Sequence, residues 1–141
     1  MPPGESVTVE QLLKRYCELG DFLGVEAYRY VLEHGRDWEP SPLPDNYGRM
    51  RPRDCFLNAT VLAHMHPALR YVEGFAMHPA TPFPIHHAWV VDGEDRVIDP
   101  TWEQPEDCLY RGVVFSLEHI WRLGRTGMAL YNACKGRDGD K

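Results

Sequence analysis

Three residues of the chain have side chains and an order suited to nucleophilic catalysis. Cys55 opens a compact apolar stretch, His87 begins a His-Ala-Trp run, and Asp99 begins an Asp-Pro-Thr run. A thiolate can attack an acyl carbon, an imidazole within reach can take and return the proton, and a carboxylate can orient the imidazole. We therefore predict a catalytic triad of Cys55, His87 and Asp99.

The triad requires a helix that begins at the cysteine. Asp54 is a suitable N-cap and Pro67 a stop signal, and the residues between them are mostly apolar, so we expect a helix buried on most sides. The helix dipole favours negative charge at the N-terminus, where Cys55 lies. A lone cysteine in an apolar stretch is often only a small buried hydrophobic residue, so its position alone does not identify a nucleophile.

The triad also requires two strands that hold the histidine and the aspartate. Short apolar runs between turn-rich stretches predict four strands in an antiparallel meander. These runs are Arg70–Met77, Ile85–Val91, Arg96–Asp99 and Tyr110–Phe115. Successive residues of a strand point to opposite faces, so Trp89 shares the face of His87 and can cover its ring. His86 is the rival base, but it faces the other way.

The turn between the second and third predicted strands sets a condition on the triad. A three-residue loop, Asp92–Glu94, would place His87 opposite Asp99 on the same face. A two-residue loop would place Ala88 opposite Asp99 and turn His87 away, because a shift of one residue changes the face. A working triad therefore predicts an odd number of loop residues or a bulge.

The N-terminal third of the chain is expected to be helical. Thr8 and Gln11 form a capping box before a helix at about residues 8–19. A second helix is expected from Asp21 to Gly35. Residues 36–54 hold five prolines or glycines and little periodicity, which predicts a loop.

These elements predict a single α+β domain over residues 1–141, with helices packed against one sheet. Ser116 is expected to open a further helix. The predicted parts are a helical N-terminal part with a Pro-rich loop at 1–53, the core at 54–115, a C-terminal helical part at 116–134 and a polar tail at 135–141.

Composition and charge argue against several classes of partner and location. The formal net charge is −6 and basic residues do not cluster, so neither nucleic acid nor a membrane surface is an expected partner. The chain lacks a membrane-length apolar window and its start is not a signal peptide, so we expect it in the cytoplasm. There its four cysteines are expected to be thiols. No cofactor is expected, and His64 and His66 lack further ligands at metal-site spacing, so no metal is expected.

Several motifs resemble a known superfamily. They are Asp54-Cys55-Phe56-Leu57-Asn58-Ala59, Tyr71-Val72-Glu73-Gly74, His87-Ala88-Trp89-Val90 and Ile98-Asp99-Pro100-Thr101-Trp102. Together they resemble the Cys, His, Asp signature of transglutaminase-like proteins within the papain-like superfamily. They are also similar to a group of small uncharacterised bacterial and phage proteins that share these motifs. The resemblance covers about residues 54–115.

The resemblance implies a papain/transglutaminase-like core, in which the nucleophile helix packs on a small antiparallel sheet, with extra N-terminal helices in this chain. It also implies acyl transfer. Cys55 would be the nucleophile, His87 the general base and then acid, and Asp99 the group that orients the imidazole. The backbone amide of Cys55 would be one oxyanion donor.

Other residues are candidates for the surroundings of the site. The superfamily's second oxyanion donor precedes the cysteine and is often a glutamine, which residues 36–54 lack; Asn46 and Tyr47 are the candidates that remain. Trp89, Asn58 and His86 are candidates to line the site. Asn58 and Glu73 could line the site, or each could instead be a structural polar residue. Loop aromatics that could flank a cleft are Trp38, Tyr47 and Phe83.

The predicted function is cysteine-dependent acyl transfer on an amide of a protein or peptide. Water would resolve the thioester in a peptidase or glutamine deamidase, and an amine would resolve it in a transamidase; the sequence leaves these open. The alternative is a catalytically silent binding module or inhibitor on the same fold.

Overall fold

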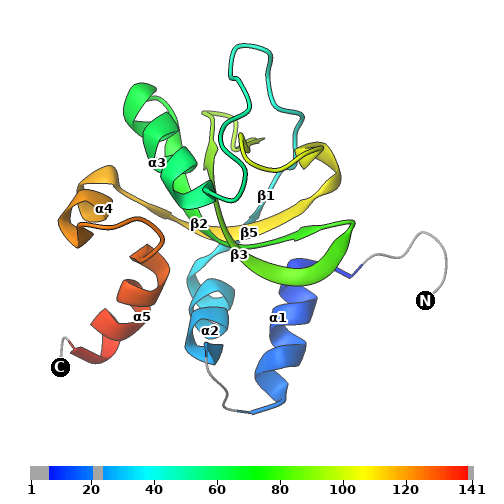
Figure 1. Cartoon of the computed structure of the whole chain (residues 1–141). Helices are drawn as coiled ribbons and strands as arrows, with labels where there is room; N and C mark the ends of the chain where they lie inside the picture. The colour runs from blue at the N-terminus through cyan, green and yellow to red at the C-terminus, as the bar shows by residue number, and fades with distance from the viewer. Residues whose placement is uncertain (1–6, 21–23, 140–141) are drawn as a thin grey trace.

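The computed structural model of the protein describes residues 7–20 and 24–139. It contains a five-stranded antiparallel sheet in the order β1-β5-β2-β3-β4 (Figure 1). The strands are β1 (Arg36–Trp38), β2 (Arg70–His78), β3 (Thr81–Val91), β4 (Val97–Ile98) and β5 (Leu109–Phe115). The α+β class and the four predicted strands are confirmed, and β1 lies in a segment that was expected to be only loop.

The strand order differs from the predicted meander. β2, β3 and β4 follow one another as hairpins, but β5 pairs with β2 and lies between β2 and β1. β2 is therefore the central strand, and every residue from 71 to 77 is buried. A strand covered on both faces is expected to have such a continuous buried run.

A pair of glycines explains how closely β5 approaches β2. Gly74 of β2 pairs with Gly112 of β5. A Cβ atom at Gly74 would overlap the carbonyl group of Arg111 and the Cα atom of Gly112. Glycine inside a strand often marks such a close approach of two backbones. The glycine of the Tyr-Val-Glu-Gly motif thus has a packing role between the two strands.

The sheet is strongly curled, so that its two edges meet. The N–H of Val97 in β4 donates to the carbonyl oxygen of Glu39, one residue beyond β1, at 2.9 Å. Glu39 also forms a β-bridge with Arg96. The enclosed face holds a cluster of buried side chains, which comprises Trp38, Val72, Ala76, Trp89, Val91, Val97, Cys108 and Tyr110.

The described part of the chain has five α-helices and one short 3-10 helix. They are α1 (Val9–Glu18), α2 (Val25–His34), α3 (Cys55–Met65), α4 (Leu117–Leu123), α5 (Ala129–Gly139) and the 3-10 helix η1 (Pro105–Asp107). The predicted helices are confirmed, although the expected start of α2, at Asp21, lies outside the described residues. The tail prediction is wrong in part, because α5 continues to Gly139. Its first turns pack Leu130 and Cys134 against α1 and α2, which favours continuation of the helix.

Helix caps follow the sequence at two ends and depart from it at a third. The capping box of α1 is confirmed, with Gln11 N–H donating to Thr8 Oγ1 at 3.1 Å. Ser116 caps α4 by accepting from the N–H of His119 at 3.1 Å. Asp54 occupies the N-cap position of α3, but its side chain makes no cap hydrogen bond and pairs instead with Arg51 at 3.3 Å.

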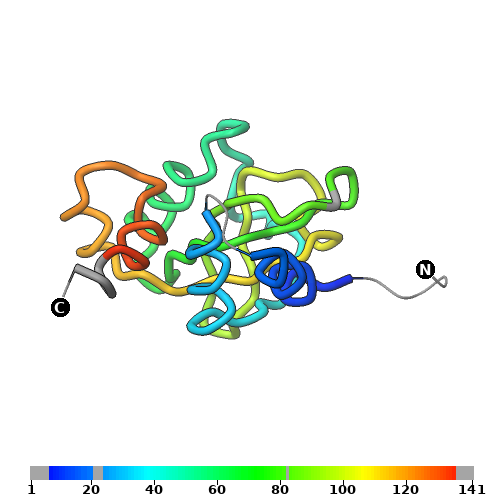
Figure 2. The backbone as a smooth tube through the Cα atoms, turned by 90° about the horizontal axis from the view of Figure 1, so that it is seen from below, coloured from blue at the N-terminus to red at the C-terminus, as the bar shows by residue number. Residues whose placement is uncertain are grey.

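The helices cover the outer face of the curled sheet. α3 packs on Tyr71, Ala88 and Val90, and α1, α2 and α5 pack around Phe75 and Met77. In Figure 1, α1, α2 and α5 lie below the sheet, and α3 lies above it with the loop that precedes it. Figure 2, seen from below, shows α4 and α5 together at one end of the molecule. The twist of the sheet thus divides its outer face into two areas, and α3 covers one of them.

Candidate active site

The β3–β4 turn satisfies the condition that the triad requires. Val91 pairs with Val97 and Val90 with Ile98, so the loop has five residues, 92–96. The predicted three-residue loop is wrong, but five is also an odd number, so His87 and Asp99 share the enclosed face. The longer loop is held by the Asp92 carboxylate, which accepts the N–H groups of Glu94 at 2.9 Å and Arg96 at 3.0 Å.

His87 and Asp99 form a buried pair inside the curled sheet. His87 Nε2 lies 2.8 Å from Asp99 Oδ2, and the two residues are only 1% and 0% exposed. The hydroxyl of Tyr110 donates to the same oxygen at 2.8 Å. Asp99 Oδ1 accepts the N–H groups of Thr101 at 3.0 Å and Trp102 at 3.3 Å. The carboxylate is therefore fully hydrogen-bonded and fixed in orientation.

The environment of the pair keeps both residues charged. Burial alone would raise the pKa of Asp99, but the positive charge and hydrogen bond of His87, with the bonds from Thr101 and Tyr110, hold it below its usual range. Burial alone would lower the pKa of His87. The Asp99 carboxylate and its hydrogen bond, together with the side chain of Cys55, outweigh burial and raise it to about 9. His87 is thus an imidazolium at neutral pH.

Cys55 meets the ring of His87 from the start of α3. It is the first residue of the helix and is 8% exposed. His87 Nε2 is bonded to Asp99, so the second ring nitrogen, Nδ1, is the one available to the thiol. The structure thus brings together the three residues predicted as a triad, in the order thiol, imidazole, carboxylate.

The N-terminus of α3 has free amide groups beside the thiol. The first N–H groups of any helix lack intrahelical partners. Thr8 and Ser116 supply side-chain caps for α1 and α4, whereas α3 has no side-chain cap among the described residues. The backbone amide of Cys55 therefore lies where an oxyanion could accept its hydrogen bond.

The loop before Cys55 is bonded to the segment that follows Asp99. The N–H of Met50 donates to the carbonyl oxygen of Pro100 at 2.8 Å, and Arg49 Nη2 donates to the carbonyl oxygen of Thr101 at 2.9 Å. Arg49 also pairs with Glu103 at 3.2 Å. These contacts fix the start of α3 relative to Asp99. Arg49 was not predicted, because a loop arginine has no periodicity that would distinguish it.

Asn58 strengthens the same connection from within α3. Its buried side-chain amide donates to the carbonyl oxygen of Arg51 at 2.7 Å and to Thr101 Oγ1 at 2.9 Å. Both bonds connect α3 to neighbouring segments. The contacts of Asn58 are thus those of a structural polar residue.

Aromatic rings surround the imidazole. Trp102 stacks on His87 with ring centroids 4.0 Å apart and planes at 22°, and Trp89 stacks at 6.0 Å and 28°. Tyr110 packs edge-on against Trp89 at 4.9 Å. Trp89 lies on the face of His87 as predicted from strand alternation, but Trp102, predicted only as part of a motif, lies closer. Its position next to the predicted Asp99 was the available signal.

His86 has a different partner on the opposite face. Its Nε2 lies 2.8 Å from Oε2 of Glu73, a carboxylate that is fully buried. Glu73 also accepts from the Tyr71 hydroxyl at 2.6 Å and from the N–H of Leu130 at 3.0 Å. Burial and the neighbouring carboxylate raise the pKa of Tyr71. His86 is thus tied to the outer face and to α5, away from Asp99.

The two candidates for a second oxyanion donor lie elsewhere. The Tyr47 ring packs edge-on against His66, with centroids 5.0 Å apart. His66 is the C-cap of α3, at the opposite end of the helix from Cys55. Asn46 is exposed in the turn before Tyr47. The structure brings neither side chain to the thiol. The other two aromatics expected in loops lie in strands: Trp38 ends β1 and is buried in the enclosed cluster, and Phe83 lies in β3 and is exposed.

The histidines at the end of α3 contact aromatic rings. His64 packs against Trp121 at 5.8 Å, and His66 contacts Tyr47. Within residues 7–20 and 24–139, no group of three or more His, Cys, Asp or Glu side chains is arranged to hold a metal ion. Across the same residues, no helix combines the length and apolar character needed to span a membrane.

The geometry of Cys55, His87 and Asp99 has to be interpreted from this chain itself. No protein-family model, curated protein sequence or solved structure matches the chain.

Proposed function

We propose that the protein transfers acyl groups from amides through a thioester on Cys55. The observation that supports this most is the imidazole of His87, which is bonded to the Asp99 carboxylate at 2.8 Å and interacts with Cys55 on its other side. Thiol acyl transfer needs a nucleophile, a base within reach and a group that orients the base. The three residues supply these groups on one helix and two neighbouring chain segments.

The charges favour a reactive thiol at neutral pH. The pKa of His87, raised to about 9, keeps its ring protonated. An imidazolium beside a thiol, at the N-terminus of a helix, favours the thiolate. Asp99 remains ionised because its pKa is lowered by His87 and by the hydrogen bonds it accepts. Cys55 would therefore act as the nucleophile beside a protonated His87.

The reaction follows from this pairing. The Cys55 sulfur forms a bond to the amide carbon, and the carbonyl oxygen becomes an oxyanion that the Cys55 N–H can stabilise. The carbon–nitrogen bond then breaks as His87 donates its proton to the leaving amine. Water or a second amine attacks the thioester while His87 takes its proton, which regenerates the thiolate. Water gives hydrolysis or deamidation, and an amine gives transamidation.

The motifs that resemble transglutaminase-like proteins support the same class. In this proposal the fold is a papain/transglutaminase-like core, with α3 as the nucleophile helix and β3 and the residues after β4 as the source of the base and the carboxylate. The proposed substrate is an amide of a protein or peptide, and the proposed location is the cytoplasm.

An acyl-enzyme burst tests the proposal. p-Nitrophenyl acetate should release one equivalent of p-nitrophenolate per protein in a fast phase, because the thiolate is acylated faster than the thioester is resolved. Intact-mass and peptide analysis should locate one acetyl group on Cys55. Hydroxylamine should then resolve the thioester, and with a glutamine dipeptide as the amide substrate it should yield the hydroxamate.

Three variants make this test specific. Cys55→Ala should lose the burst and the adduct, whereas Cys108→Ala should keep both, because burial raises the pKa of the Cys108 thiol to about 12. His87→Ala should slow acylation by about 100-fold or more. If Cys55 is acetylated no faster than the other cysteines, the protein is a silent binding module and the proposal is wrong.

A further inference from the structure

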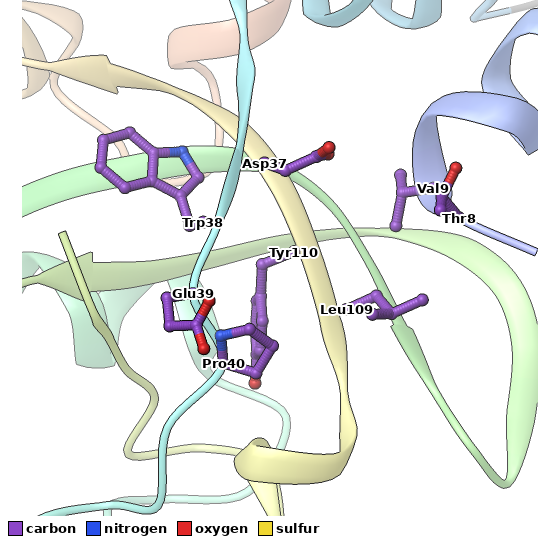
Figure 3. A pocket seen from close by; sticks show the side chains of 8 residues that line it. All are labelled: Thr8, Val9, Asp37, Trp38, Glu39, Pro40, Leu109 and Tyr110. Carbon is purple, nitrogen blue, oxygen red and sulfur yellow. The ribbon is translucent and has the colours of Figure 1, made fainter. Parts of the chain in front are cut away.

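A pocket of about 240 Å³ lies beside the curled sheet, apart from Cys55. It is bounded by the start of α1, by β1 with the two residues after it, and by the start of β5 (Figure 3). Its lining residues are Thr8, Val9, Asp37, Trp38, Glu39, Pro40, Leu109 and Tyr110. The volume is below the usual range of sites for drug-sized ligands and suits a group the size of one long side chain.

The walls of the pocket are mainly apolar and aromatic. Val9 and Leu109 lie on one side in Figure 3, and Pro40 and the ring of Tyr110 lie on the other. Trp38 already has the guanidinium group of Arg36 over its ring, 4.1 Å from the centroid. Aromatic rings attract cations through their negative faces. An aliphatic chain could therefore lie between these walls with a cationic end near the aromatic residues.

The charges around the pocket favour a cation over an anion. Asp37 pairs with Arg111 at 3.2 Å, and Glu10 lies 3.8 Å from the same arginine. Glu39 has no ion pair among the residues that the structure describes, and in Figure 3 its carboxylate lies beside Pro40 and Tyr110. Asp37 and Glu10 thus share one guanidinium, and Glu39 is the carboxylate available to a ligand.

Tyr110 connects the pocket to the candidate catalytic pair. Its ring lines the pocket, and its hydroxyl donates to Asp99 Oδ2 at 2.8 Å. The same oxygen is bonded to His87 Nε2. A ligand that contacts the ring of Tyr110 is therefore one side chain away from Asp99.

We propose that this pocket binds an alkylammonium group, as at the end of a lysine side chain, and that its occupancy is transmitted through Tyr110 to Asp99 and His87. The binding does not depend on the proposed function, because it requires no reaction at Cys55. A protein that binds the cation but has an unreactive Cys55 would keep this proposal and lose the other.

A titration of the full chain, labelled with ¹⁵N, tests the binding. N-acetyl-lysine N-methylamide should produce saturable shifts in residues 37–40 and 109–110 and in the indole N–H of Trp38, which donates to Gly112. The neutral analogue, N-acetyl-norleucine N-methylamide, should bind about fivefold more weakly, because it lacks the charge. Affinity should be low, in the millimolar range, since the carboxylate is exposed to water.

Variants and a second probe complete the test. Glu39→Gln should weaken binding of the lysine derivative to the level of the norleucine derivative, whereas Glu118→Gln, an exposed change on α4, should not. n-Pentylamine should bind too if the ammonium and its chain suffice; binding of the lysine derivative alone would instead indicate a polypeptide side chain. Equal binding of the charged and neutral derivatives, or no saturable shift in the pocket, would overturn the proposal.

The link to Asp99 is tested with Tyr110→Phe, which keeps the ring and removes the hydroxyl. The lysine derivative should shift the ring signals of His87 in the wild-type protein. In Tyr110→Phe it should still bind but leave the His87 signals unchanged. Persistence of the His87 response in this variant would show that Tyr110 does not transmit occupancy.

Discussion

His86 and His87 are adjacent in β3, yet each pairs at 2.8 Å with a different buried carboxylate on opposite faces of the sheet, His86 with Glu73 and His87 with Asp99. The alternation of side chains along a strand produces this division. The enclosed face receives the histidine that meets Cys55, and the outer face receives the one that supports α5. The two residues therefore provide matched controls for each other.

Replacement of His86 should leave the reactivity of Cys55 unchanged, in contrast to replacement of His87. His86→Phe keeps a ring beside Phe56, whose ring lies 4.6 Å from that of His86, and removes the bond to Glu73. It should lower the free energy of unfolding by about 1–3 kcal/mol, because Glu73 is left with one bond fewer while buried. The pH dependence of Cys55 alkylation should stay as in the wild type. A changed pH profile in His86→Phe would show that the base role has been assigned to the wrong histidine.

Stability should fall as the pH rises through the pKa of His87. That pKa is 6.5 for an unperturbed histidine and about 9 in the folded protein. A raised folded pKa contributes stability that is complete below about pH 6.5 and lost as the pH rises through about 9. Thermal melts across this range should show a falling Tm. In Asp99→Asn the fall should disappear or reverse, since the buried imidazole then disfavours its proton. An unchanged pH dependence in Asp99→Asn would contradict the charge assignment.

At acidic pH the sign is opposite for Asp99. Its folded pKa is below the ordinary value of 3.8. The stability it contributes is present above that value and is lost as the pH falls through the lower folded pKa. Acid melts of wild type and Asp99→Asn should therefore converge at low pH.

Removal of the Tyr110 hydroxyl should affect both stability and reactivity. Tyr110→Phe loses a hydrogen bond of 2.8 Å to a buried carboxylate, which costs about 1.5–3 kcal/mol. It should also slow acylation of Cys55, because Asp99 orients His87 less firmly. Tyr47→Phe is the control: its ring lies at His66, so both quantities should change little. A large loss of acylation in Tyr47→Phe would restore Tyr47 as an oxyanion donor.

Asn58→Ala should loosen the start of α3 from the Asp99 segment. The change removes bonds to Arg51 and to Thr101 of 2.7 and 2.9 Å and leaves the hydroxyl of the buried Thr101 without this donor. Chemical denaturation should show a loss of about 2–3 kcal/mol. Acylation of Cys55 should slow in the folded variant. Asn132→Ala, at an exposed position of α5, should leave both unchanged; equal effects of the two changes would refute the role of Asn58.

Local sequence signals predicted much of the fold. The capping box at Thr8, the cap at Ser116 and the apolar runs identified four helices and four strands because each signal depends on nearby residues. β1 was missed because it has only three residues, too few to show alternation, and a proline-rich stretch follows it. The place of β5 beside β2 depends on pairing between distant segments. Gly74 and Gly112 permit this pairing, but two isolated glycines do not predict it.

The candidate site was predictable where chemistry is distinctive and not where it depends on loops. Cys55, His87 and Asp99 have rare side-chain chemistry and lie in recognisable motifs. Tyr110 resembles an ordinary core residue of a strand, and only the curl of the sheet directs its hydroxyl to Asp99. The side chain of Arg49 donates to the backbone carbonyl of Thr101 in another irregular segment, and spacing in the sequence contains no information on such a contact.

The most direct test of the triad is the rate at which iodoacetamide alkylates Cys55, followed by peptide mass analysis between about pH 5 and about pH 9 in wild type and His87→Ala. We expect faster alkylation of Cys55 at neutral pH in the wild type than in His87→Ala, because a protonated His87 lies beside the thiol there. In His87→Ala the rate at neutral pH should fall at least tenfold, and the profile should rise with a midpoint near that of a free thiol, about 8.5. Identical pH profiles in the two proteins would contradict the account.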